Sequence, residues 1–201
     1  MQKIETKSSR EKKQRRNQII IGIALVSIML LSTLGYSIMD RNSGQSQGEI
    51  KLYNNFKFLS SAGLWKIQNQ DFSLSTRYLP QDVLNISYSA ALSPEFFAGK
   101  EVYFSALSAE TRLAVNELDG NLPALRAQFA CTVEQENMTE CSALPVKTCK
   151  DNLIIITAQE NKSEFLPSRI YSKENCIYIE AESKNLIRAA DRLLFGVYKI
   201  M

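Results

Sequence analysis

The longest predominantly apolar stretch lies near the start of the chain, over residues 19–39, and contains no charged side chain. A helix needs roughly 20 apolar residues to cross a bilayer, so this run is long enough. A cleaved signal peptide has a shorter apolar region, of about 7–15 residues, followed by small residues at the cleavage site. Here only Thr33 and Gly35 form a poor pair of that kind. The pattern therefore predicts an uncleaved transmembrane helix over 19–39.

Beyond residue 50 the apolar positions alternate with polar ones, and short segments rich in turn residues interrupt the alternation. This period of two is typical of strands with one buried face, and short connections favour antiparallel neighbours. It predicts strands around Phe56 and Phe58, over 64–68 and over 72–78. A further strand is expected over 83–88.

In the middle of the chain the pattern changes to a helical period. Residues 101–107 form a short apolar run that predicts a buried strand, and Ser108 is a suitable helix N-cap. After it, apolar residues recur at spacings of four, three and four, as on one face of a helix. These residues are Leu118, Leu122, Leu125 and Phe129. We therefore expect one kinked helix or two short helices over 109–131.

The last fifty residues alternate again and then return to the helical period. Residues 153–157 predict a central strand, and the strands expected over 168–172 and 176–181 flank a turn. An apolar stripe from Asn185 to about Lys199 predicts an amphipathic helix with Ser183 as its N-cap. We expect this helix to pack on the sheet; a membrane-lying or partner-binding helix is the alternative. The fold class is α+β, with a mostly antiparallel sheet, a middle helical region and a C-terminal amphipathic helix.

Charge gives the predicted span an orientation. Seven basic and two acidic residues give the leader, residues 1–18, a charge of +5, and the whole chain carries +3, so the remainder carries −2. Lys and Arg beside a span stay on the cytoplasmic side, which places the leader in the cytoplasm and residues 40–201 outside the cell membrane. Residues 40–49 have the polar composition of a flexible stalk, and 50–201 are enough for one domain.

The charge also bears on partners. Orientation and attraction to anionic lipid head groups account for the basic leader. The nearly neutral outer part gives no electrostatic reason to expect nucleic acid as a partner. The expected partners are the lipid bilayer, through 19–39, and a protein of the cell envelope or surface.

All four cysteines, Cys131, Cys141, Cys149 and Cys176, fall in the predicted outer domain. An even number outside the cytoplasm predicts two disulfides. The chain has no histidine and no C-x-x-C pair, which argues against a zinc site or a redox-active dithiol. In a meander of the last three strands, Cys149 and Cys176 lie at the same end of the sheet, so we pair them and leave Cys131 to Cys141.

The absence of histidine also limits enzymatic chemistry, because it removes Ser-His-Asp and Cys-His catalytic groups. No glycine-rich nucleotide-binding loop is present, and the sequence assigns no catalytic, cofactor-binding or metal-binding residue. A glycosidase-like carboxylate pair drawn from Glu180, Glu182 and Asp191 is the enzymatic alternative. Three Asn-x-Ser/Thr motifs mark possible glycosylation sites. They begin at Asn85, Asn137 and Asn161.

The chain combines a basic leader, a single span and a cysteine-bearing outer domain with two C-terminal segments, NCIYIE (175–180) and RAADRLLFG (188–196). In this combination it resembles small uncharacterised membrane-anchored proteins of archaea. The resemblance covers the span and the C-terminal part of the outer domain, and it implies no activity. We expect a membrane-tethered interaction or accessory domain without catalysis. The alternatives are a membrane-anchored carboxylate-dependent hydrolase and a pilin-like envelope subunit. The pilin-like alternative lacks a glycine at the expected processing position, around 16–19.

Overall fold

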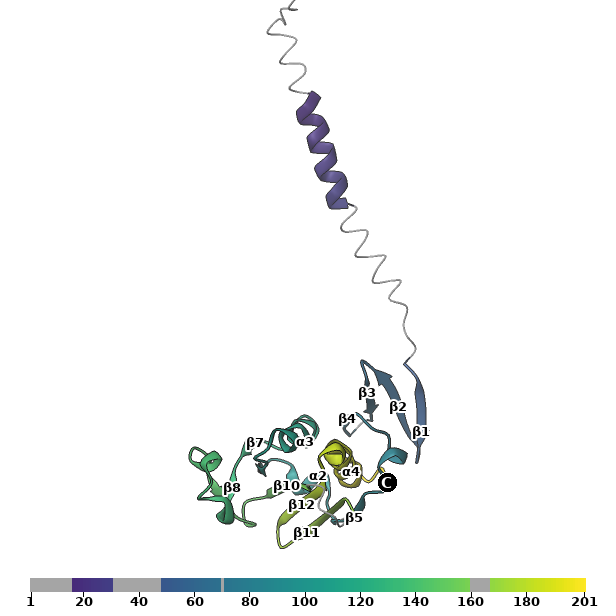
Figure 1. Cartoon of the computed structure of the whole chain (residues 1–201). Coiled ribbons are helices and arrows are strands. Elements are labelled where there is room, and N and C mark those ends of the chain that lie inside the picture. The colour runs from purple at the N-terminus through teal and green to yellow at the C-terminus, as the bar shows by residue number, and fades with distance from the viewer. Residues whose placement is uncertain (1–15, 31–47, 70, 160–166) are drawn as a thin grey trace, which may run out of the picture. The chain divides into compact units, whose positions relative to one another are not determined.

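The computed structural model describes residues 16–30, 48–69, 71–159 and 167–201 (Figure 1). The chain divides into two units between residues 47 and 48. In the first unit, residues 16–30 form a helix with exposed side chains. Within the described ranges, no helix is long and apolar enough to cross a membrane. Part of the predicted span, 31–39, lies outside the described residues, as do 1–15 of the leader and 40–47 of the stalk.

The second unit begins with a four-stranded antiparallel sheet of order β1-β2-β3-β4. Its strands are β1 (Ile50–Tyr53), β2 (Phe56–Ser61), β3 (Leu64–Gln68) and β4 (Ser73–Thr76). Two-residue turns join the first three strands, and both central residues of each turn have positive φ: 45° and 67° at Asn54 and Asn55, 53° and 78° at Ala62 and Gly63. Such turns match the right-handed twist of the strands. The predicted meander is confirmed, and β1 extends it by one strand.

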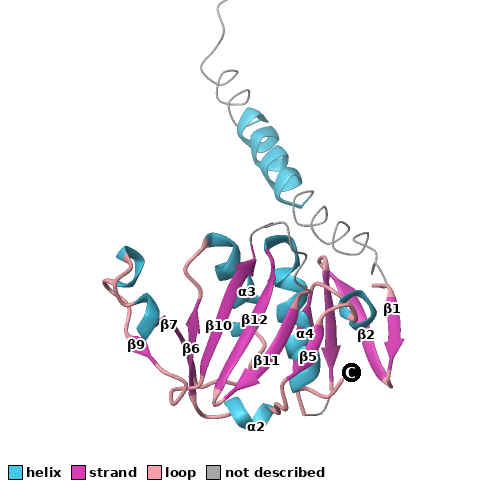
Figure 2. Ribbon diagram, turned by 60° about the horizontal axis from the view of Figure 1, so that its bottom comes forward, coloured by secondary structure: helices cyan, strands magenta, loops and turns pink. Residues whose placement is uncertain are grey.

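A six-stranded sheet of order β5-β11-β12-β10-β6-β7 forms the other side of this unit (Figure 2). Its strands are β5 (Ser87–Ser89), β6 (Glu101–Ser105), β7 (Arg126–Phe129), β10 (Leu153–Gln159), β11 (Arg169–Lys173) and β12 (Cys176–Glu182). Only the β11–β12 pair is antiparallel among the described pairs of this sheet. The α+β class, with an antiparallel sheet and helices, is confirmed, but most neighbours in the larger sheet are parallel.

The position of β12 explains this difference from the expected meander. The chain makes the predicted hairpin from β11 to β12, but β12 then lies between β11 and β10 instead of at the far edge. The alternating residues Ile177, Ile179 and Ala181 of β12 are almost fully buried, whereas β11 buries only Ile170. Placing the more apolar strand at the centre of the sheet buries more apolar surface.

Two long helices fill the space between the sheets: α3 (Ala109–Asp119) and α4 (Leu186–Val197). In Figure 1, α4 lies between the four-stranded sheet and the larger sheet. The Phe195 ring meets Phe58 of β2 edge-on at 6.1 Å, while the other side of α4 contacts β12. Nine of the twelve α4 residues are buried, so the helix is covered on both sides and not on a single stripe.

Ser108 caps α3 as predicted, since its side chain accepts a hydrogen bond from the Thr111 N–H. The expectation of helix over 109–131 is wrong after Asp119. The helix ends at Gly120, and residues 126–129 pair with β6 as the edge strand β7. Leu125 is 73% exposed, not on a buried helical face. Pro123, which cannot donate a backbone hydrogen bond, and pairing with β6 outweigh the helical spacing.

The structure also differs from two smaller expectations, a strand over 83–88 and the N-cap of the last helix. The strand expected over 83–88 is a 3-10 turn, η1 (Pro80–Val83), followed by the short strand β5. The predicted N-cap Ser183 starts another 3-10 turn, η4 (Ser183–Asn185), and the cap of α4 is Asn185. Both are shifts of a few residues at an element's end, where local geometry decides the boundary.

Candidate functional site

The six-stranded sheet has one face toward α3 and α4, and the buried side chains of its opposite face belong to a separate, small cluster. We call the opposite face the open face. Because side chains alternate along a strand, it carries every second residue of the central strands. These residues include Leu153, Ile155 and Thr157 on β10, Arg169 and Tyr171 on β11, and Cys176, Tyr178, Glu180 and Glu182 on β12.

Strand register sorts these side chains into rows that run across the sheet. Ile155 lies opposite Tyr178, and Tyr178 opposite Tyr171, which makes an apolar row. The next row, Thr157, Glu180 and Arg169, is polar. The open face therefore changes from apolar to charged along the strand direction.

The two tyrosines form a stack. Their rings lie parallel, 5° apart in plane, with centroids at 4.9 Å. The Tyr171 hydroxyl donates to Glu180 Oε1 and Arg169 Nε donates to Glu180 Oε2, each at 2.7 Å. Donation to the carboxylate, helped by desolvation, raises the pKa of Tyr171 to about 12. The phenol thus stays protonated and keeps the stack fixed beside the carboxylate.

The segment between β7 and β10 forms a wall at one end of the open face. It contains two short paired strands, β8 (Cys131–Thr132) and β9 (Val146–Lys147), and two 3-10 turns, η2 (Val133–Gln135) and η3 (Thr139–Cys141). The rest of this segment, between these short elements, is irregular. Gln135 Oε1 accepts from Ser105 Oγ and from the Thr132 N–H, so η2 is held to the end of β6.

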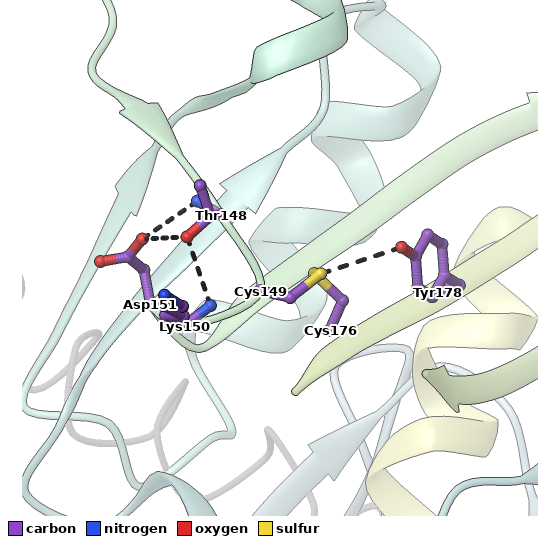
Figure 3. Close-up of a disulfide and its surroundings, with 6 residues drawn as sticks. All are labelled: Thr148, Cys149, Lys150, Asp151, Cys176 and Tyr178. Atoms are coloured by element: carbon purple, nitrogen blue, oxygen red, sulfur yellow. Dashed lines mark hydrogen bonds between the residues drawn. A yellow bond between two sulfur atoms is a disulfide. The ribbon is translucent and has the colours of Figure 1, made fainter. Parts of the chain in front are cut away.

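Two disulfides fix this wall. Cys131 bonds to Cys141 and Cys149 to Cys176, which is the predicted pairing. The second disulfide joins the wall to the first residue of β12, and the Cys149 sulfur lies 4.0 Å from the Tyr178 hydroxyl (Figure 3). This disulfide requires only that β10 and β12 start at the same sheet end, and their parallel pairing meets that condition.

A local turn orients the chain just before β10. The Thr148 N–H and hydroxyl both donate to Asp151 Oδ2 (Figure 3), which lowers the pKa of Asp151. Lys147 Nζ lies 3.6 Å from Asp151 Oδ1 and 4.1 Å from the centre of the Tyr103 ring. The Lys147 ammonium is therefore held at the edge of the open face between a carboxylate and an aromatic ring.

Between the wall and the rows of the sheet lies a cleft of about 750 Å³. Its floor is the open face, and its sides come from η2, the segment over 147–150 and the β11–β12 turn. Apolar and charged groups are mixed in the lining, with Lys147 and Lys150 on the wall and Glu134, Glu174 and Glu180 around them. A cleft of this mixed character suits a ligand that brings both apolar and polar groups.

The three candidate catalytic carboxylates do not come together. Glu180 and Glu182 share the open face, because β12 extends through both. Each already has an ion-pair partner: Glu180 pairs with Arg169, and Glu182 pairs with Lys184 at 2.8 Å. Asp191 is fully buried on α4, on the other side of the sheet. Donors occupy both oxygens of Glu180, so neither is free to protonate a leaving group.

Asp191 has a structural position between α4 and the four-stranded sheet. Its Oδ2 accepts from the backbone N–H groups of Arg77 and Tyr78 at 3.0 and 2.9 Å. Burial, and next the negative charge of Glu117, raise the pKa of Asp191 well above its usual range. The carboxyl group ties the chain just after β4 to α4.

The remaining site candidates are on the surface or outside the described residues. Asn85 and Asn137 are exposed in turns, and Asn161 lies outside the described residues. Among the residues that the structure describes, no group of three or more His, Cys, Asp or Glu side chains lies close enough together to hold a metal ion.

The open face was not predicted from the sequence, although the pairing of its two tyrosines could have been. Tyr171 and Tyr178 are three residues on either side of the Glu174-Asn175 turn, so hairpin register alone places them opposite each other. The contribution of β10 and the wall depends on strand order, which the hairpin does not set. Neither a protein-family model, nor a curated protein, nor a solved structure matches the chain.

Proposed function

We propose that this chain is a single-pass membrane protein whose outer domain binds a partner protein of the cell envelope on the open face of its six-stranded sheet, without catalysis. The leader stays in the cytoplasm, residues 19–39 form the anchor, and the outer domain, 50–201, lies outside. The partner covers the cleft and the two rows of side chains beside it.

The observation that carries this proposal is the one-sided covering of a mostly parallel sheet. Sheets with parallel strands are normally covered on both faces, because apolar side chains project from both. Here α3 and α4 cover one face, while Ile155, Tyr171 and Tyr178 on the open face remain partly exposed. A partner surface supplies the missing layer.

The character of the open face favours a protein over a purely polar ligand. A stacked tyrosine pair beside an aliphatic side chain makes an apolar centre, and Glu180, Arg169 and Lys147 lie around it. Protein interfaces have this arrangement of an aromatic-rich centre and a polar rim. The disulfides hold the wall in one conformation before binding, which reduces the ordering cost of association.

The location outside the cytoplasm has two independent supports. Two disulfides are typical of an oxidising compartment, and the basic leader before the apolar run orients an anchor with its N-terminus inside. Labelling of intact cells with an impermeant amine reagent tests this orientation. Lysines beyond residue 50 should react and Lys3 to Lys13 should be protected; the reverse pattern would reject it.

Photocrosslinking in native membranes tests the binding face. A photoreactive phenylalanine analogue replaces Thr157, which is exposed on the open face, and the matched control replaces Leu113, which is 53% exposed on α3. We expect one discrete protein adduct from position 157 and none from position 113. Equal adducts from both positions, an adduct to a glycan alone, or no adduct from position 157 would contradict the proposal.

A further inference from the structure

The four-stranded sheet also has a face turned away from the core, which we call the outer face. Strand register places Ile50 opposite Leu59, Leu52 opposite Lys57, and Leu59 opposite Lys66 on this face. The alternate residues Phe58, Ile67 and Leu74 are buried on the inner face against α4 and the core. The outer face is therefore separate from the open face of the larger sheet.

Large apolar side chains are exposed together on the outer face. Leu52 is 77% exposed, Ile50 51% and Leu59 41%. Single exposed leucines are ordinary, but these three are neighbours in register, and two of them lie on the edge strand β1. An exposed apolar edge strand invites association unless something covers it.

The charged residues of the outer face are all basic. Lys57 and Lys66 are exposed beside the apolar side chains, and neither has an ion-pair partner among the described residues. The strand positions that share this face, as the register assigns them, include no Asp or Glu. The surface is thus apolar and positive at once.

The place of this sheet in the chain limits what it can reach. Strand β1 starts at Ile50, and only residues 40–49 separate it from the end of the predicted anchor. Even fully extended, ten residues span at most about 35 Å. The outer face is therefore kept within a short distance of the bilayer for as long as the anchor is inserted.

We infer that the outer face docks on the surface of the bilayer that holds the anchor, with anionic lipid as its ligand. Ile50, Leu52 and Leu59 enter the boundary between head groups and acyl chains, and Lys57 and Lys66 pair with lipid phosphates. This inference depends on the anchor proposed above. It leaves the open face of the larger sheet free for the partner protein.

A second copy of the chain is a less suitable occupant. In a two-fold pair of outer faces, the lysines of both copies would meet without any acidic residue of those faces to balance them. Like charges brought together at an interface oppose association. An anionic lipid surface instead provides the opposite charge together with an apolar layer.

Fluorescence quenching in the full chain tests the inference. In a Trp65→Phe background, which removes the only tryptophan, Leu52→Trp reports on the outer face and Leu125→Trp, at a position 73% exposed elsewhere on the domain, is the control. The protein is reconstituted into vesicles of phosphatidylcholine, or of equal parts phosphatidylcholine and phosphatidylglycerol, with brominated acyl chains as quenchers. Each reporter adds one substitution, at an exposed leucine, to the Trp65→Phe background.

We expect strong quenching of the Leu52→Trp reporter in the anionic vesicles, weak quenching in the neutral ones, and none for Leu125→Trp. Adding Lys57→Gln and Lys66→Gln should shift the docked-to-free ratio about fivefold for each lysine removed. Added salt should also lower the docked-to-free ratio of the chain that keeps both lysines.

Three results would overturn the inference: no quenching at position 52, equal quenching at both positions, or quenching that grows with protein density at constant lipid composition. The last result would indicate contact between copies. Alkaline carbonate extraction tests the anchor separately. A chain that resists extraction but shows no quenching at position 52 refutes docking alone, whereas a chain that is extracted refutes the anchor.

Discussion

On β12, Ile177, Ile179 and Ala181 point toward α4 and are almost fully buried, whereas Tyr178 and Glu180, on the same strand, face the cleft and remain partly exposed. The two faces of one sheet thus have different partners. The covered face joins a core that continues through α4 to the four-stranded sheet. The open face joins only a small cluster around Tyr103, Leu153 and the Cys149–Cys176 disulfide.

Under the proposed function, this difference separates the face that stabilises the fold from the face that binds a partner. Apolar burial, the main favourable term in folding, is concentrated on the covered face. The open face relies on a disulfide-fixed wall and a stacked tyrosine pair to keep its shape. Substitutions should therefore affect folding on one face and partner binding on the other.

The largest contrast in stability is expected from neighbouring positions of the two faces. Ile179→Ala on the covered face should lower the free energy of unfolding by about 2–5 kcal/mol, because it leaves a cavity between β12 and α4. Thr157→Ala on the open face should change it by less than about 0.5 kcal/mol. Urea titration followed by Trp65 fluorescence measures both. Equal losses would show that the open face is part of the core.

The disulfides provide the next contrast, within the open side itself. Replacing Cys149 and Cys176 together by Ser opens a loop with a sequence separation of 27, against 10 for Cys131 and Cys141. Chain-entropy estimates give losses of about 3.5 and about 2.7 kcal/mol respectively. The same unfolding measurement compares the two double variants. A larger loss from the Cys131 and Cys141 pair would contradict the ranking.

The buried carboxyl group of Asp191, on the covered side, predicts a pH dependence of the free energy of unfolding. Its folded pKa is raised above the unfolded value, so the folded state holds the proton more tightly and stability falls as pH rises between the two pKa values. Within that window the loss is about 1.4 kcal/mol per pH unit.

Asp191→Asn should abolish this fall, because the amide keeps an acceptor for the N–H groups of Arg77 and Tyr78 and does not titrate. Unfolding free energies measured from pH 4 to pH 8 check the expectation. The free energy of unfolding of the variant should rise relative to that of the parent protein as pH increases. Parallel plots of this free energy against pH would show that Asp191 is already ionised in the folded state.

The smallest effect is a titration on the open face. Glu180→Gln should lower the pKa of Tyr171 from about 12 toward its ordinary value of 10.0, because the charged carboxylate that accepts a hydrogen bond from the hydroxyl is gone. Absorbance or NMR titration of the tyrosines measures the shift. Glu182→Gln is the matched control, since Glu182 pairs with Lys184 and not with Tyr171, and it should leave the titration unchanged.

Much of the local structure could be predicted from neighbouring residues. The alternation around Phe56 and Phe58, the turn at Glu174-Asn175 and the Ser108 cap all appear where their chemistry requires them. The disulfide pairing was also within reach, because it needs only that β10 and β12 start at the same sheet end. The strands, the turn and the cap depend on a few residues close together in the chain, whereas the Cys149–Cys176 pair, with a sequence separation of 27, depends on the direction of the strands.

The sequence by itself determined the hairpin turns, most strands and the start of α3, because steric and hydrogen-bonding preferences act over a few residues. It also determined the cysteine pairs, because the direction of the last three strands is enough to place Cys149 and Cys176 at the same sheet end. Only the tertiary structure decided that β12 lies beside β10, that residues 126–129 join β6 as a strand, and that α4 is covered on both sides. Those outcomes depend on which distant apolar surfaces are buried against each other. The free energy of that burial is larger than the local conformational preferences of the residues involved. The cleft on the open face follows from the same choice of strand order.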